Sequence, residues 1–426
     1  MAALMPVPAD QRVLRAPTTA PVRDASTAHA PEQTPARAAF HSVEIQATVA
    51  ETSELWNALR ANALSTPYQS PGLLGPWQTH VADNEGFETA VVVARDEAGR
   101  PVALLPLGVR VRLGVRVARF MGGSHTNYNL MVIRLDALDA FTPDECRRLL
   151  TEAARALRLD CYALRNQPYA WEGVQNPFAG LPRQPSPDSG YRGPLAPTLD
   201  DHLKLFMSSK ARSNQRRKMR RFEERGTPRI YRADLPHERA RLLDAYLTQK
   251  GEQFAARGIP NVFERPGVRN FLADAAAIDG GAPTIDLYGF DLDDEVIAVT
   301  GGVSDGARYC GMFISITGSE HSKYSPGEML MNFVVEDAIR RGIRTFDLGV
   351  GAAPYKRVYC PTEEPLFDSI FGVTAKGRSA AAAFSALTGA KVKIKSTPWA
   401  YGLIQRVRRW KAQREDEPLA GGADEA

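Results

Sequence analysis

A glycine loop near the end of the chain carries the residues best suited to bind a ligand. Gly349 and Gly351 follow a short expected strand at Thr345–Leu348, and Tyr355 and Lys356 close the loop. Glycines let a ligand approach the backbone and leave N–H groups free to point at it. The pattern predicts a cleft at the end of the strand; a packed helix–strand unit with a flexible exit loop fits it as well.

The helix before this strand is expected to begin at Ser325 and end at Gly342. Ser325 is a favourable N-cap, Pro326 suits the first helical position, and Glu328 can complete a capping box. Its apolar stripe is expected at Leu330, Phe333, Val334, Ala338 and Ile339. Because helix starts favour anions, this end can hold the phosphates of a ligand. The candidate ligand-binding residues are Lys323, Tyr324, Ser325, Gly327, Gly349 and Gly351; a solvated loop is the alternative.

The two halves of the chain repeat one order of elements. Thr142–Glu145 matches Ser325–Glu328 at the start of a late helix, and Asp160–Leu164 matches Arg344–Leu348 as the strand that follows. Antiparallel hairpins are expected before each of these helices. The repeat predicts an α/β (α+β) fold of two like units, each a mixed, mostly antiparallel sheet flanked by helices.

Composition shifts set the expected boundaries of these units. They are a disordered segment at 1–40, a first domain at 41–185, a linker at 186–197, a second domain at 198–380, a basic helical segment at 381–414 and a disordered tail at 415–426. The linker is rich in proline, glycine and serine. The basic, aromatic segment at 381–414 fits peripheral contact with an anionic membrane or packing on its own domain.

The composition is that of a soluble protein with no metal site. The net charge of +4 is too small for this length to indicate a nucleic-acid binder. Cys146, Cys161, Cys310 and Cys360 are scattered without a C-x-x-C pair, which argues against zinc and against a disulfide framework. We therefore expect reduced thiols and a cytoplasmic protein. No apolar run approaches the roughly 20 residues of a membrane helix.

Three motifs resemble the GNAT acyltransferase superfamily, and more closely its CelD/BcsL-like group, associated with cellulose biosynthesis and related to Fem-type aminoacyltransferases. They are the basic stretch Lys210–Arg221, the stretch Tyr324–Leu330, and Phe346–Gly349 with Tyr355 and Lys356. The resemblance covers roughly residues 41–374. It implies tandem GNAT-like units and an acyltransferase that uses acetyl-CoA or another acyl-CoA. The expected reaction is direct transfer to an amine or hydroxyl of a small-molecule or saccharide acceptor, in exopolysaccharide or envelope biosynthesis.

The resemblance also suggests roles for residues near the glycine loop. In the Fem-type relatives a lysine in this region stabilises charge in the transition state, which makes Lys356 the first candidate for an oxyanion or phosphate contact. Such a donor is typically worth about 3 kcal/mol of barrier. Tyr355 either donates a proton to the leaving group or packs its ring. Asp347 either acts as base or orienter in the cleft or caps a neighbouring loop.

Substrate contacts are expected at two further places. Lys210 and Arg212 match the family motif in a helix whose cations spread beyond one face, so they contact an anionic substrate or belong to a solvated face. His125 and Tyr128, in a loop of the first half, are candidates to line a cleft between the domains.

The donor itself stays open at this point. The glycine-rich pyrophosphate loop of many GNAT enzymes is replaced by the stretch Gly318–Gly327, which lacks that signature. One alternative is a Fem-like aminoacyltransferase that uses aminoacyl-tRNA, the one case in which a nucleic acid is a partner. Another is a non-catalytic scaffold with the same fold.

Overall fold

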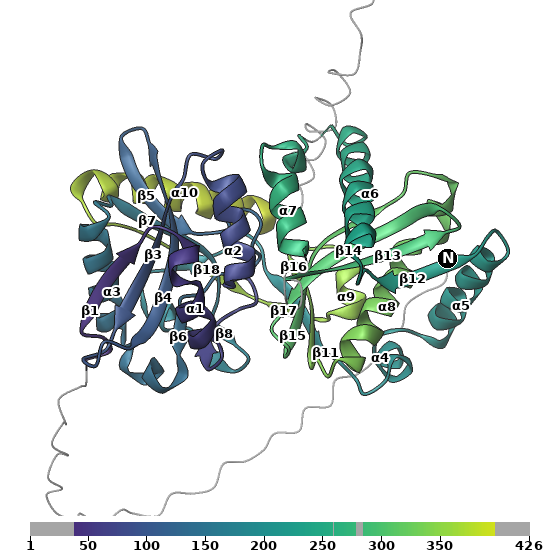
Figure 1. The fold of residues 1–426 in the computed structure, drawn as a ribbon, viewed down its shortest axis with the longest axis horizontal. Helices are drawn as coiled ribbons and strands as arrows, with labels where there is room; N and C mark the ends of the chain where they lie inside the picture. The colour runs from purple at the N-terminus through teal and green to yellow at the C-terminus, as the bar shows by residue number, and fades with distance from the viewer. Residues whose placement is uncertain (1–37, 259, 278–283, 397–426) are drawn as a thin grey trace, which may run out of the picture. The chain divides into compact units, whose positions relative to one another are not determined.

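The computed structural model describes residues 38–258, 260–277 and 284–396 (Figure 1). Most of the segment expected to be disordered at 1–40, all of the tail at 415–426 and the second part of the basic segment at 381–414 lie outside the described residues. The first part of that basic segment belongs to helix α10 (Ala375–Ser396).

The first sheet is antiparallel except at one pair of strands. Its order is β1 (Ser42–Gln46), β3 (Glu88–Arg95), β4 (Pro101–Arg112), β5 (Val115–Phe120), β7 (Cys161–Pro168), β18 (Leu366–Gly372) and β10 (Gln184–Pro185), with β2 (Ala63–Leu64) and β6 (Val132–Arg134) beside β4. The parallel pair is β5 and β7. The helices of this part are α1 (Val49–Arg60), α2 (Pro71–Trp77) with its π-helical continuation Gln78–Ala82, and α3 (Pro143–Ala156). In Figure 1, α10 is yellow; it packs against β18 and β7.

The second sheet has the same design. Its order is β12 (Pro228–Arg232), β13 (Ile285–Leu292), β14 (Glu295–Ser304), β15 (Arg308–Ile316), β16 (Thr345–Val350), β11 (Gly190–Pro194) and β17 (Thr362–Glu364). Its helices are α4 (Leu199–Phe206), α5 (Ser209–Glu223), α6 (Pro236–Ala255), α7 (Val268–Ala276), α8 (Pro326–Arg340) and the short α9 (Lys356–Tyr359). The parallel pair is β15 and β16. The expected mixed, mostly antiparallel sheets flanked by helices are confirmed, as is the repeat.

Helix α8 buries the apolar stripe expected from the sequence. Leu330, Val334 and Ala338 are fully buried and pack with Phe290 and Ile297 of the sheet. Burying a Leu or Val side chain stabilises the fold by about 1.5–3 kcal/mol. Helix α6 packs on Val299 of β14. The next residue along the strand, Ala298, packs instead with the buried residues of α8. Since successive residues of a strand face opposite sides, α6 and α8 cover opposite faces of the sheet.

The start of α8 differs from the prediction. Ser325 has a left-handed backbone (φ 60°, ψ 56°), and its side chain makes no capping hydrogen bond. Its hydroxyl instead accepts a hydrogen bond from the Lys218 ammonium at 2.9 Å, which also binds the Glu328 carboxylate at 2.9 Å. The predicted capping box is therefore wrong, because a cation from α5 holds both of its members. The predicted stop at Gly342 is confirmed by a φ of 73°.

Two segments of the chain, β10–β11 and β17–β18, each pass from one sheet to the other. β11 lies within the predicted linker at 186–197 and pairs with β16 and β17. β18 lies within the predicted second domain at 198–380 and pairs with β7 of the first sheet. The crossing segments also pair with each other, since β10 runs antiparallel to β18 and β11 to β17. They form a two-stranded ribbon from one sheet to the other.

Candidate active site

The second sheet opens where β15 and β16 separate. The two strands are paired only from Arg308 opposite Thr345 to Cys310 opposite Asp347. Beyond that point β15 continues to Ile316 with β14 alone. A pocket of about 640 Å³ lies along the end of β15. It is lined by Gln249, Lys250, Glu252, Gln253, Ala256, Arg257, Ile314, Ser315, Ile316, Thr317, Gly318, Ser322 and Tyr355.

The outer edge of β15 offers backbone groups to this pocket. Helix α6 satisfies two of its carbonyls: Lys250 donates to the Ile314 oxygen at 3.1 Å and Gln253 donates to the Ile316 oxygen at 2.9 Å. In an antiparallel strand the N–H and C=O groups of one residue share an edge, so the N–H groups of Ile314 and Ile316 face the same way. An extended ligand with amide groups can bind such an edge as an added strand would.

Tyr355 is the one predicted catalytic residue among the pocket's lining residues. Its side chain comes from the loop after β16, directly before α9, and it is 40% exposed. Burial raises the pKa of its hydroxyl, which keeps the proton on the oxygen. A protonated phenol beside a pocket can donate to a leaving group.

Lys356 is turned toward the glycine loop. Its ammonium donates to the carbonyl oxygens of Gly349 at 3.2 Å and Val350 at 3.0 Å, and its side chain is largely buried. An ammonium has three donors, so one is left for a substrate. Burial lowers the pKa of Lys356, and the charge of Asp347 partly opposes this. Its contact with an oxyanion or phosphate stays a prediction.

The glycine loop has the backbone that its glycines permit. Gly349 has a φ of 72° and Gly351 a φ of 96°, in the left-handed region that other residues rarely adopt. A Cβ on Gly349 would also meet the Asn127 amide nitrogen at 2.4 Å. The two glycines thus let the loop turn and pack.

Asp347 anchors this loop. It is fully buried, and it accepts hydrogen bonds from the Gly349 N–H at 2.5 Å and the Tyr128 hydroxyl at 2.9 Å. The Arg308 guanidinium, 1% exposed, binds it at 2.5 Å and also binds Glu364. Burial alone would lower the pKa of Arg308, but Asp347 and Glu364 raise it. Of the two roles left open for Asp347, these contacts match the loop cap.

Tyr128 and His125 of the first half lie in packed surroundings. Tyr128 is fully buried, with its hydroxyl on Asp347. The His125 ring packs on Phe271 with 5.1 Å between centroids. Burial, with the nearby charge of Arg265, lowers the pKa of His125 to about 4, so it is neutral at pH 7. Both residues pack between segments of the two halves; their role as substrate contacts stays a prediction.

The loop before α8 reaches the pocket through Gly318 and Ser322. The donor-binding residues expected there have protein partners. Lys323 pairs with Glu320 at 3.0 Å, and the Arg225 guanidinium lies 4.3 Å from the centre of the Tyr324 ring. A Cβ on Gly327 would lie 2.9 Å from the Ile316 side chain, so this glycine allows close packing of α8 on β15. Direct contact of these residues with a donor stays a prediction.

Lys210 and Arg212 lie at the start of α5. Lys210 is exposed and lines a separate hollow with Asn214 and Arg217. Arg212 donates to the Met207 carbonyl at 2.7 Å, which ties the helix start to the preceding turn. Neither residue is among those that line the pocket beside Tyr355.

The sequence did not point to Gln249, Lys250 and Gln253, which hold or line the edge of β15. These residues share one face of α6, but polar side chains on a helix face carry no motif. Within the described residues, no group of three or more His, Cys, Asp or Glu side chains is arranged to hold a metal ion. The helices of the same residues include none with the length and apolar character to cross a membrane.

Residues 209–357 match the acetyltransferase (GNAT) domain family. This GNAT domain contains the pocket, the edge of β15 and the glycine loop. A comparison with curated proteins found no match.

Solved structures similar to this chain include FemX, with 11% identity over 78% of this chain and 98% of that chain, and a TM-score of 0.53. A conserved protein of unknown function from Bacteroides thetaiotaomicron has 12% identity over 77% of this chain and 99% of that one, with a TM-score of 0.52. A tandem GNAT protein from the clavulanic acid biosynthesis pathway has 15% identity over 78% and 99%, with a TM-score of 0.44. At these identities the first two likenesses concern the fold alone.

Proposed function

We propose that this protein transfers an acyl group from an acyl-CoA thioester to an amine or hydroxyl acceptor in the GNAT domain. The observation that carries the proposal is the outer edge of β15, which faces a pocket of about 640 Å³ beside Tyr355. The pantetheine arm of coenzyme A contains amides that match the N–H groups of Ile314 and Ile316.

The reaction follows from these groups without a covalent enzyme intermediate. The acceptor attacks the thioester carbon, a C–N or C–O bond forms, and the C–S bond breaks. Glu252, the carboxylate among the lining residues, takes the acceptor's proton, and the Tyr355 hydroxyl protonates the leaving thiolate. The remaining N–H donor of Lys356 stabilises the oxyanion.

The finer assignment rests on the CelD/BcsL-like motifs. We propose acetyl-CoA as the donor and a hydroxyl or amine of a sugar or polysaccharide precursor as the acceptor, in exopolysaccharide or envelope biosynthesis. Such a reaction belongs to the cytoplasm, where acyl-CoA is made, with peripheral contact to the membrane.

A second candidate is aminoacyl transfer from aminoacyl-tRNA. The exposed cations of α5 favour it, because a row of arginines can follow a phosphate backbone. They are Lys210, Arg216, Arg217, Arg220 and Arg221. The likeness of this chain's fold to that of FemX is consistent with this candidate.

Calorimetric titration with acetyl-CoA, a longer acyl-CoA and aminoacyl-tRNA separates the candidates. Acyl-CoA binding without tRNA binding supports the first. Binding of tRNA that falls steeply with salt supports the second. Binding of no donor contradicts both and favours the non-catalytic scaffold.

One backbone substitution tests the binding mode. Ile314→Pro removes an outward N–H without removing a hydrogen bond to β14, so we expect weaker binding of acetyl-CoA and of pantetheine. A companion variant, Gln253→Ala, tests the carbonyl side of the same edge: it removes the side-chain donor to the Ile316 oxygen and keeps every backbone N–H. Unchanged affinity in a folded Ile314→Pro protein would contradict the edge model.

A further inference from the structure

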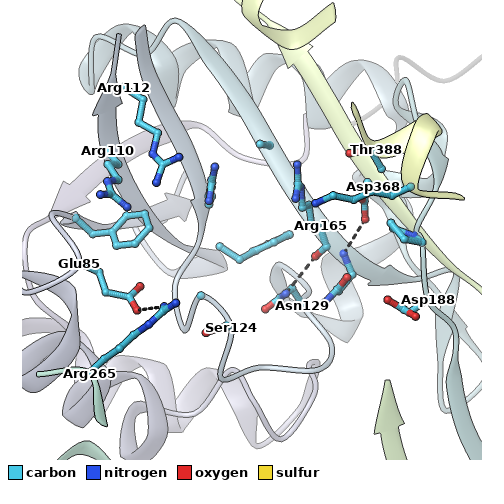
Figure 2. Close-up of a pocket in the computed structure, with 18 of the residues that line it drawn as sticks. Glu85, Arg110, Arg112, Ser124, Asn129, Arg165, Asp188, Arg265, Asp368 and Thr388 are labelled. Atoms are coloured by element: carbon cyan, nitrogen blue, oxygen red, sulfur yellow. Dashed lines mark hydrogen bonds and ion pairs between the residues drawn. The ribbon is translucent and has the colours of Figure 1, made fainter. Parts of the chain in front are cut away.

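A second pocket lies in the first sheet, where β5 and β7 separate (Figure 2). Its volume is about 490 Å³, and it is bordered by the ends of β4, β5, β7 and β18 and by one side of α10. Seven lining residues are cations: Arg110, Arg112, Arg119, Arg165, Arg265, Lys391 and Lys395. Three are carboxylates: Glu85, Asp188 and Asp368.

Two of the three carboxylates of this pocket form ion pairs, and the third accepts hydrogen bonds. Glu85 pairs with Arg265 at 3.4 Å, and Asp188 pairs with Lys395 at 2.5 Å. Oδ1 of Asp368 accepts hydrogen bonds from the Ser186 hydroxyl and from a backbone N–H of β7, while its buried Oδ2 has no hydrogen-bond partner among the described residues. Burial raises the pKa of Asp368, which favours its neutral form, and the charge of Arg165 partly opposes this.

Four arginines of the pocket take part in no ion pair among the described residues, although the charge of Arg165 acts on the nearby Asp368 carboxylate. They are Arg110, Arg112, Arg119 and Arg165. Figure 2 shows Arg110 and Arg112 on one side of the pocket and Arg165 on the other. The Arg165 Nε is buried and has no hydrogen-bond partner among the described residues. Burial lowers the pKa of Arg119, and the charges of Arg165, Arg112 and Arg110 lower it further. Like charges gathered in a half-buried hollow repel one another unless an anion joins them.

We propose that this pocket binds a diphosphate-bearing ligand. Guanidinium groups bind phosphate oxygens through paired N–H donors, and two adjacent phosphates supply enough oxygens for arginines on both sides of the pocket. Two polar lining residues, Ser124 with its hydroxyl and Asn166 with its amide, can complete the contacts. A soluble diphosphate ester and a lipid diphosphate headgroup share this chemistry. The proposal is independent of acyl transfer in the GNAT domain.

The full-length protein is titrated with inorganic pyrophosphate by calorimetry. The test variant is Arg119→Gln/Arg165→Gln, and the control is Arg155→Gln, which removes an exposed arginine of α3 outside the pocket. We expect saturable binding with one pyrophosphate per chain, weakened by roughly tenfold or more in the test variant and unchanged in the control. Thermal melting of each variant shows that it is folded.

Two further arms identify the source of the ligand. One uses uridine diphosphate in solution, and the other uses phosphatidylcholine vesicles that contain a lipid diphosphate. Binding in either arm that depends on Arg119 and Arg165 supports the site and identifies the ligand class. The proposal would be overturned if pyrophosphate did not bind saturably, or if Arg155→Gln weakened its binding as much as the double variant does. It would also be overturned if the double variant bound both further ligands as tightly as the wild type. If the double variant is unfolded, Arg112→Gln, an exposed change on β4, replaces it with the same expectations.

Discussion

The two pockets occupy matching places in the two sheets but use their charges in opposite ways. Each lies where a parallel strand pair separates, β5 from β7 and β15 from β16. In the second sheet most of the cations near the pocket bind protein groups: Lys250 and Lys356 bind backbone carbonyls, and Arg308 binds carboxylates. Arg257, an exposed lining residue, is the exception among the described residues. In the first sheet four arginines have no such partner among the described residues.

The difference shows how one repeated unit can serve two purposes. A pocket in which most cations are held by the protein presents backbone edges and a neutral phenol to its ligand, which suits an extended amide-containing donor. A pocket with an excess of guanidinium groups suits a compact polyanion. We therefore treat the second opening as the site of chemistry and the first as a site of binding.

The largest expected effect comes from breaking the charge pairing of the second sheet. Arg308→Gln leaves Asp347 buried without its cation, and we expect a loss of about 3–5 kcal/mol in the free energy of unfolding. Urea denaturation measures it. The control, Arg100→Gln, breaks an exposed ion pair with Asp96 and should cost under about 1 kcal/mol. Equal losses in the two variants would show that the buried ion pair contributes no more to the free energy of unfolding than the exposed one.

His125, in the loop beside the first pocket, makes stability depend on pH mainly because it is buried. Its pKa is lowered to about 4 in the folded protein, from an ordinary value of 6.5. Between these values the unfolded chain binds more protons than the folded one, so stability falls as the pH falls through this window, by about 3 kcal/mol in all. Unfolding free energies near pH 7 and pH 4 should differ less in His125→Asn than in the wild type. If the free energy of unfolding changed equally between pH 7 and pH 4 in both proteins, a group other than His125 would cause the pH dependence.

Lys356→Ala asks whether a cation already bound to the glycine loop also serves the reaction. We expect turnover to fall roughly a hundredfold, because an oxyanion donor is lost and the carbonyls of Gly349 and Val350 lose their partner. Steady-state kinetics measures this, with Lys204→Ala, an exposed lysine of α4, as control. A wild-type rate in Lys356→Ala would exclude this lysine from the mechanism.

The smallest expected effect is that of Tyr355→Phe. A thiolate leaves readily and needs little help from an acid, so we expect the rate to fall about tenfold. The affinity for the donor should change little, because the ring stays in place. A rate unchanged over the whole pH range would indicate that Tyr355 only packs against the donor.

The sequence predicted the parts of the fold that depend on local patterns. The repeat, the stripe of α8 and the stop at Gly342 follow from spacing and from glycine's backbone freedom. It missed the hydrogen bond from Lys218 to the Ser325 hydroxyl, because that contact joins residues far apart in the chain. The strand at Gly190–Pro194 has the composition of a linker, and only its pairing with β16 makes it part of a sheet.

The site was predictable to a similar extent. Glycines and a tyrosine–lysine pair indicated the loop, and the structure brings Tyr355 to a pocket. Lys250 and Gln253 were not found, since their role depends on how α6 lies against β15. The arginines of the first pocket come from separate strands, and only the sheet brings them together.

The ribbon of β10–β11 and β17–β18 has a consequence for cutting and truncating this chain. Both of its strands run from one sheet to the other, and they are hydrogen-bonded to each other at each end. A protease that nicks the short connection between β10 and β11 would leave the halves tethered through the second strand. A fragment that ends before β18 would leave β7 with an open edge in the first sheet, so neither half is a self-contained piece for expression.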